Sequence, residues 1–293
     1  MAVSYLIFRQ KHLSLDAAMK VKTMLADFLS FVTPKSMHKA RFAAVGAVVQ
    51  SLMQNGQCTV TASGRDFDSG TLERHGIKRA DRLLRNKALQ TEAPLLYGTM
   101  TRLLRQGKQP LILVDWSKAD TEKRHFILRA SLALEGRPLT LHQVVVPIDE
   151  YTCPHVHKAF LHWLKQVLPA DFKPVIITDA GFKVPWFKQI RKLGWHYIAR
   201  VRGNQTLQLL GQEAFITVAK VYKKARATPQ LLGEVKLTKA QQYRTQAVLV
   251  GTGWKLLKIM CGVNYHCLFA SIMTAGCKGK ADIGTGIVMR NGI

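Results

Sequence analysis

The chain has 293 residues, of which 47% are hydrophobic and 21% are charged, and this balance excludes a mainly disordered, fibrous or collagen-like protein. Its 43 lysine and arginine residues outnumber its 18 aspartate and glutamate residues, so the formal net charge is +25. A positive charge of this size attracts polyanions and favours nucleic acid as the partner. The alternative is a basic protein of the ribosome or of a membrane surface.

Membrane and secretory signals are missing from the sequence, which predicts a cytoplasmic protein. No stretch approaches the roughly 18 uninterrupted apolar residues that a membrane helix needs, and the N-terminus has no secretory signal. The five cysteines are an odd number, which argues against a disulfide framework. Cys153, His155, His157 and His162 match no zinc pattern. They are interpreted as capping or partly exposed residues of an amphipathic helix.

The first 106 residues are predicted to form a mostly helical, basic domain. Apolar residues at helical spacing predict four helices, over 14–32, 36–55, 79–89 and 94–106. Ser36 is predicted to open the second helix and Gly56 to end it, whereas Pro94 suits the first turn of the last helix. A polar, glycine-containing stretch at 59–76 separates the second helix from the third.

Residues 107–202 are predicted to form a mixed α/β core. Apolar, β-prone runs and amphipathic segments follow one another in the order strand, strand, strand, helix, strand, helix, strand. The strands are expected over 110–115, 125–134, 138–147, 173–179 and 195–201, and the helices over 154–168 and 184–193. Residues 135–137 are expected to form a hairpin turn.

Residues 203–254 are predicted to be a small β-rich insertion. The prediction rests on alternating β-branched residues in the segments 213–222 and 231–250. The composition changes after Trp254, and the segment 276–293 is rich in glycine without a clear periodicity. The last 39 residues, 255–293, are therefore treated as a separate tail.

Two aspartates are candidate catalytic residues because each ends an apolar strand and precedes a turn. They are Asp115 and Asp179. If their strands are neighbours in one sheet, the two carboxylates meet, and paired carboxylates bind hard divalent cations such as Mg²⁺. In a chain of net charge +25, this pair indicates metal-dependent chemistry on a phosphodiester. The alternative is that both acids only cap turns or following helices.

Six basic residues are candidates for binding DNA phosphates: Arg79, Arg82, Arg85, Lys118, Arg200 and Arg202. The first three recur every third residue along a predicted helix and share roughly one face. The lysine follows the first aspartate closely, and the last two alternate out of the strand after the second aspartate. The alternative for these residues is a solvated charged surface. Trp116 is interpreted as a packing residue rather than as one that stacks on a base.

Four blocks in this order resemble the DDE transposases of bacterial insertion sequences, specifically the cut-and-paste insertion-sequence-four group. The blocks are HGIKRADRLLRN at 75–86, LILVDWS at 111–117, IITDAGF at 176–182 and GWHYIARVRGN at 194–204. Each block alone is a weak signal, whereas the ordered run is specific. The likeness spans roughly residues 35–250.

The resemblance implies an RNase H-like catalytic core, an N-terminal DNA-binding domain and a β-rich insertion. It implies that Asp115 and Asp179 bind two Mg²⁺ or Mn²⁺ ions. In such enzymes water nicks the transposon end, the freed 3′-OH attacks the opposite strand, often through a hairpin, and strand transfer into target DNA follows. The partners implied are double-stranded DNA and a second copy of the chain, as a homodimer in a synaptic complex associated with the bacterial nucleoid.

One departure from this family concerns its third acid, a glutamate in a Tyr-x2-Arg-x3-Glu-x6-Lys pattern. The chain has no glutamate after Glu234, and its only later acid, Asp282, has no helical pattern around it. Residues 255–293 are expected to be a divergent tail left by a frameshift or a premature stop. The sequence thus predicts a transposase with impaired catalysis. The alternatives are a remnant that binds transposon ends without cutting them, and a metal-dependent nuclease with the same core.

Overall fold

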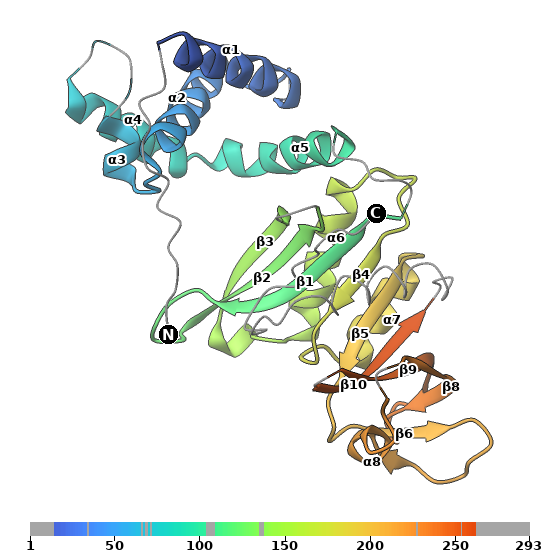
Figure 1. Ribbon diagram of the computed structural model, residues 1–293. Coiled ribbons are helices and arrows are strands. Elements are labelled where there is room, and N and C mark those ends of the chain that lie inside the picture. The colour runs from blue at the N-terminus through green and yellow to red at the C-terminus, as the bar shows by residue number, and fades with distance from the viewer. Residues whose placement is uncertain are drawn as a thin grey trace. The chain divides into compact units, whose positions relative to one another are not determined.

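The computed structural model shows two compact units, Met1–Met100 and Thr101–Ile293 (Figure 1). The described residues are 15–33, 35–65, 67, 70, 72–103, 109–134, 138–226, 228–252 and 254–261. None of the helices in these ranges is long and apolar enough to cross a lipid bilayer. The predicted division at residues 106, 202 and 254 stays a prediction.

The first unit is built from helices. They are α1 (Leu15–Val32), α2 (Lys39–Asn55), α3 (Val60–Arg65), α4 (Glu73–Leu84) and α5 (Lys87–Leu103). As predicted, α2 ends at Gly56, which has the left-handed φ of 68° that favours glycine. Ser36 does not open α2. His38 is the cap instead, because its Nδ1 accepts a hydrogen bond from the backbone N–H of Ala40 at 3.2 Å.

Three predicted boundaries in the first unit are wrong. The segment predicted as one helix over 79–89 is split, because the side-chain oxygen of Asn86 accepts hydrogen bonds from the backbone N–H groups of Ala88 and Leu89 at 3.0 and 3.3 Å. Such a cap starts a new helix, so α4 ends and α5 begins there. Pro94 consequently lies inside α5 rather than in its first turn. The polar stretch 59–76 contains α3 and the start of α4.

The helices α3 and α4 cross at two glycines. A Cβ atom on Gly64 would overlap the backbone of Ile77, and a Cβ atom on Gly76 would overlap the carbonyl group of Gly64. Only glycine permits this approach, because every other residue carries a Cβ atom. The crossing buries one side of α4, where Gly76, Ala80 and Leu83 lie, and leaves its charged side outside.

The second unit is built on a sheet with the strand order β3-β2-β1-β4-β5-β10-β9-β8-β6-β7. The strands are β1 (Leu111–Lys118), β2 (His125–Leu132), β3 (Leu139–Pro147), β4 (Val175–Thr178), β5 (His196–Val201), β6 (Thr206–Leu209), β7 (Ile216–Thr217), β8 (Gln230–Leu237), β9 (Tyr243–Thr252) and β10 (Trp254–Cys261). The helices are η1 (Ile148–Glu150), α6 (Pro154–Val167), α7 (Val184–Lys192) and α8 (Val218–Tyr222).

The first five strands form a mixed sheet, as the sequence predicted. β1 pairs with β2, and β2 with β3, in antiparallel fashion, whereas β1 pairs with β4, and β4 with β5, in parallel. The predicted order of three strands, helix, strand, helix, strand is confirmed over 111–201. This mixed α/β arrangement fits an RNase H-like core. The predicted turn at 135–137 lies outside the described residues.

The hydrophobic core of the second unit lies between the sheet and the helices α6 and α7. Its largest fully buried side chains include Phe160 and Leu164 of α6, Trp186 of α7 and Ile112 of β1. Along β1 the buried residues alternate with more exposed ones, which is typical of a strand covered on one face. The uncovered positions include Asp115, so the core fixes the strand while this carboxylate reaches solvent.

The strands after β5 extend the same sheet. β10 pairs with β5, and β9 and β8 follow. Within the predicted insertion, 213–222 is mostly not β-structure, because Val218–Tyr222 forms α8. β10 covers residues 254–261, so the start of the predicted tail belongs to a strand of the sheet.

Candidate active site

Asp115 and Asp179 occupy neighbouring positions on two adjacent, parallel strands. The register of β1 and β4 pairs Val114 with Thr178, so the next residue on each strand is one of the two aspartates. Asp179 directly follows β4, as predicted, but Asp115 lies inside β1. The prediction that Asp115 ends its strand is wrong, because β1 continues to Lys118 by pairing with β2.

The two aspartates form the middle of a row of four charged side chains across the sheet. Asp115 pairs with Arg129 of β2, and the register of β4 with β5 places Arg200 next to Asp179. Asp115 and Arg129 are directly paired and point to the same side of the sheet, whereas Asp179 and Arg200 lie one position beyond the last pair of β4 with β5. All four residues are exposed. Nε of Arg129 donates to Oε1 of Gln143 at 3.2 Å. Arg129 was not predicted from the sequence, because only the register brings it beside Asp115.

Each carboxylate has one oxygen held by the backbone that follows it. Oδ1 of Asp115 accepts a hydrogen bond from the N–H of Trp116 at 2.8 Å, and Oδ1 of Asp179 accepts one from the N–H of Gly181 at 2.8 Å. A Cβ atom on Gly181 would lie 3.0 Å from Oδ1 of Asp179, so a larger residue would crowd this carboxylate. These two backbone N–H groups orient both carboxylates.

The charge of one aspartate affects the other. Two effects raise the pKa of Asp115 above its usual value: burial, which is the larger effect, and the negative charge of Asp179. The hydrogen bond from the N–H of Trp116 lowers this pKa. The side chain of Asp115 reaches solvent, yet the surrounding protein removes enough water from the carboxyl group to disfavour its charge. A cation between the two carboxylates would relieve both effects.

The chemistry of these donors fits a hard divalent cation. Carboxylate oxygens are the ligands that Mg²⁺ and Mn²⁺ prefer. Within the described ranges, no group of three His, Cys, Asp or Glu residues is arranged to hold a metal ion. Asp115 and Asp179 are thus a two-carboxylate set, and the third protein ligand implied by the family resemblance does not lie among the described residues.

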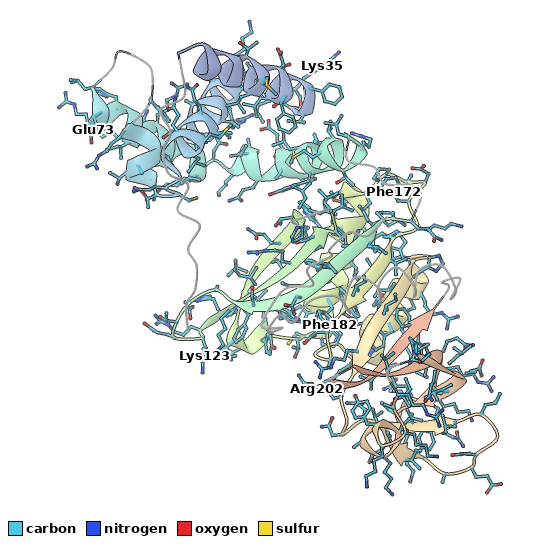
Figure 2. The ribbon with its side chains drawn as sticks, in the orientation of Figure 1. Lys35, Glu73, Lys123, Phe172, Phe182 and Arg202 are labelled. Atoms are coloured by element: carbon cyan, nitrogen blue, oxygen red, sulfur yellow. The ribbon has the colours of Figure 1, made fainter. Side chains whose placement is uncertain are left out.

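The other predicted DNA-binding residues of the second unit lie at the carboxyl ends of β1 and β5. In Figure 2, labels on Lys123, Phe182 and Arg202 mark the loops after β1, β4 and β5, and all three lie at the same edge. Lys118 and Arg202 are exposed. Since side chains alternate along a strand, Lys118 points to the face opposite that of Asp115. DNA binding by Lys118, Arg200 and Arg202 stays a prediction.

The three arginines predicted to bind DNA in the first unit have different surroundings. The guanidinium of Arg79 lies over the ring of Phe67, 5.5 Å from its centroid. Arg82 is exposed on α4. Arg85 caps the end of α4, and its Nε forms an ion pair with Oδ1 of Asp81 at 3.0 Å. Their role in DNA binding stays a prediction.

His157 is buried, which corrects its interpretation as a partly exposed residue. Its side chain is 7% exposed and packs between Trp116, Phe182 and Trp186. The amphipathic pattern of α6 places His157 on its inner face. Cys153 stands at the N-cap position of α6, but its Sγ donates to the carbonyl group of Asp149 at 3.4 Å instead of capping the helix.

The buried His157 and the half-buried His142 predict that acid destabilises the second unit. Burial lowers the pKa of His142 and that of His157 to about 4. Below pH 6.5 the unfolded chain binds a proton at each histidine that the folded chain does not bind until about pH 4, so stability falls as pH falls through this window. The raised pKa of Asp115 acts in the opposite direction.

We expect the free energy of unfolding to fall by about 2 kcal/mol per histidine between pH 7 and pH 5. Urea unfolding at both pH values measures this change, and the double variant His142→Phe/His157→Phe should show a smaller difference. Equal stability of the unaltered chain at pH 7 and pH 5 would show that these imidazoles are not held neutral.

A family model described as the transposase DDE domain matches residues 62–268 of the chain. The match contains both aspartates, Arg129, Arg200 and all ten strands. It begins later than residue 35 and ends later than residue 250, where the likeness was expected to end. The residues 255–268 therefore resemble the family, contrary to the prediction for the tail. A search of curated proteins found no match.

Proposed function

Because the chain belongs to the family of transposase DDE domains, we propose that it is the transposase of a bacterial insertion sequence of the insertion-sequence-four, cut-and-paste group. It binds the terminal inverted repeats and acts as a homodimer in a synaptic complex. The observation that carries this proposal is the row Arg129, Asp115, Asp179 and Arg200, in which two carboxylates are flanked by two arginines.

The two parts of this row suit the two parts of a phosphodiester substrate. Asp115 and Asp179 would hold Mg²⁺ or Mn²⁺, which when bound stabilises the attacking and leaving oxygens on phosphorus. Arg129 and Arg200 bind backbone phosphates on either side of the carboxylates, since one guanidinium group can donate two parallel hydrogen bonds to a phosphate. The backbone N–H groups of Trp116 and Gly181 keep the carboxylates oriented during the reaction.

Labelled transposon-end DNA with Mg²⁺ or Mn²⁺ tests this function and its two rivals. Strand-transfer products would support the transposase. Cleavage that never yields joined products would favour a metal-dependent nuclease, and binding without any cleavage would favour a remnant that occupies the ends. The last outcome is compatible with the proposed ancestry of the chain, because its sequence offers no glutamate after Glu234.

We expect DNA affinity to depend strongly on salt. If the protein neutralises about six phosphates, affinity should fall roughly 1,000-fold between about 50 and 200 mM salt. Replacing Arg79, Arg82 and Arg85 together with alanine should weaken binding and make the salt dependence less steep. The log–log slope should change by about 0.9 for each phosphate that the protein no longer neutralises. Fluorescence anisotropy with labelled end DNA measures both the affinity and the slope.

A charge-matched variant separates phosphate binding by α4 from the general attraction of a basic protein. Lys220, Lys223 and Lys224 are exposed in and after α8, and alanine at all three removes the same charge. This control should bind end DNA with an affinity close to that of the unaltered chain. Equal weakening by the two triple variants would remove the α4 arginines from the interface.

A further inference from the structure

His157 contacts the residues that follow both carboxylates. Trp116 directly follows Asp115, and its Nε1 donates a hydrogen bond to Nε2 of His157 at 3.3 Å. Phe182 directly follows Gly181, and its ring stacks on the imidazole with the centroids 5.3 Å apart and the planes at 29°. One side chain of α6 thus packs against Trp116 within β1 and against Phe182 in the loop after β4.

Trp116 of β1 and the loop after β4 also supply the backbone donors that orient the carboxylates. The N–H of Trp116 holds Oδ1 of Asp115, and the N–H of Gly181 holds Oδ1 of Asp179. The first donor is the backbone of Trp116 itself, and the second donor, Gly181, directly precedes Phe182. A displacement of either aromatic side chain therefore moves the donor for one carboxylate. The position of His157 therefore bears on both carboxylates together.

The imidazole has the protonation state that this arrangement needs. An indole N–H only donates, so Nε2 of His157 must be an unprotonated acceptor and Nδ1 must carry the hydrogen. Burial lowers the pKa of His157 to about 4, which leaves the ring neutral at pH 7. Trp186 packs edge-on against the ring with the centroids 5.0 Å apart and is itself 1% exposed, so the ring is enclosed.

We propose that His157 is a positioning residue that holds Trp116 of β1 and Phe182 of the loop after β4 at the separation that the carboxylates of Asp115 and Asp179 require to bind a divalent cation together. This inference rests on the proposed function. His157 touches neither carboxylate and acts only through Trp116 and Phe182. Partners of this kind, which touch the ligands' neighbours rather than the metal, commonly alter metal affinity by about 10- to 100-fold when they are replaced.

The test is Mn²⁺ affinity of the full chain at pH 7.5, measured from the electron paramagnetic resonance signal of free Mn²⁺. His157→Phe keeps a ring but removes the acceptor, and it should weaken Mn²⁺ binding about tenfold. His157→Gln offers an amide oxygen to the indole and should recover most of the affinity. The indole N–H resonance of Trp116 should shift in the phenylalanine variant and return toward its original position in the glutamine variant.

His142 is a matched control. It is also enclosed by aromatic rings, with Trp163 at 3.8 Å and Phe160 at 4.7 Å between centroids, and burial lowers its pKa to about 4 as well. These rings belong to α6, whereas Trp116 lies in β1 and Phe182 in the loop after β4. His142→Phe should therefore leave Mn²⁺ affinity within about twofold while perturbing the same core. Equal loss of affinity in the two phenylalanine variants would overturn the inference.

Two further variants keep the outcomes distinct. Trp116→Phe removes the donor of the same hydrogen bond, and its effect on Mn²⁺ affinity should not add to that of His157→Phe. This variant alone tests the bond if His157→Phe fails to fold, and unchanged affinity in it would overturn the inference. Asp115→Asn and Asp179→Asn report on the proposed function. If they do not weaken Mn²⁺ binding, that function is wrong, whereas if they do and His157→Phe does not, only the positioning role is wrong.

Discussion

In a chain whose cleavage has been restored by a grafted C-terminal segment, Asp115→Asn and Asp179→Asn are each expected to abolish metal-dependent cleavage of transposon-end DNA while changing DNA affinity by less than about twofold. Asparagine keeps the size of the side chain and one oxygen, but it removes the negative charge that a divalent cation requires. Loss of this charge stabilisation should cost at least about 100-fold in rate. Affinity should persist because the aspartates repel DNA phosphates rather than bind them.

Asp120→Asn provides the matched control for this experiment. Asp120 follows β1 and accepts hydrogen bonds from the backbone N–H groups of Arg124 and His125 at 2.9 and 3.0 Å. It lies in the connection between β1 and β2, outside the row formed by Arg129, Asp115, Asp179 and Arg200. Cleavage should continue in this variant. Cleavage that survives both Asp115→Asn and Asp179→Asn would sink the assignment of the site.

The 293-residue chain is expected to bind end DNA but to cut and join it slowly. Two metal ions need enough carboxylate oxygen around them to hold their separation, and Asp115 and Asp179 supply two groups. A missing third group misplaces an ion by about an ångström, and misplacement on this scale can cost roughly 100-fold in rate. The family pattern places a glutamate there, whereas the only acid of this chain after Glu234 is Asp282.

A grafted C-terminal segment tests this expectation. The segment carries the helix and glutamate of the family pattern and is joined after Cys261, so that β10 keeps its pairing with β5. Mg²⁺-dependent cleavage should rise about 100-fold or more, and the same graft with glutamine in place of its glutamate should not restore it. Robust strand transfer by the chain without a graft would contradict this expectation and would point to Asp282 or another ligand.

The core of the second unit was predictable because its strands and helices carry strong local patterns. The apolar runs before Asp115 and Asp179, and the amphipathic segments 154–168 and 184–193, correspond to elements that exist within a few residues of the predicted bounds. When an acid follows a short apolar strand, its carboxylate is expected at the end of that strand, where it can reach solvent. What the pattern left open was whether the two strands are neighbours, and the parallel register of β1 with β4 decides it.

Features that depend on long-range pairing were not predictable. Arg129 is far from Asp115 in the sequence, and only the antiparallel register of β1 with β2 makes them partners. The position of Asp115 inside β1 also depends on that pairing. His157 lies beside Lys158 and near His155, and its burial follows from its helical spacing to Phe160, Leu161 and Leu164 on the inner face of α6.

Four helices of the first unit were predicted, and α3, which lies in the polar stretch 59–76, was missed. Asn86 stops one helix and caps the next within a segment whose apolar spacing is continuous. Gly64 and Gly76 belong to that polar stretch, in which no helix was predicted. They serve instead as the contact between α3 and α4, which only the tertiary structure reveals.

The central claim is that Asp115 and Asp179 hold the same divalent cation, and Fe²⁺-directed cleavage of the polypeptide tests it most directly. Fe²⁺ bound in place of Mg²⁺ generates hydroxyl radicals with ascorbate and peroxide, and these cut the backbone beside the bound ion. We expect cuts next to both residue 115 and residue 179, suppressed by excess Mg²⁺ and absent at both positions in either asparagine variant. Cuts beside only one of the two residues, or cuts that persist in Asp115→Asn, would contradict the claim.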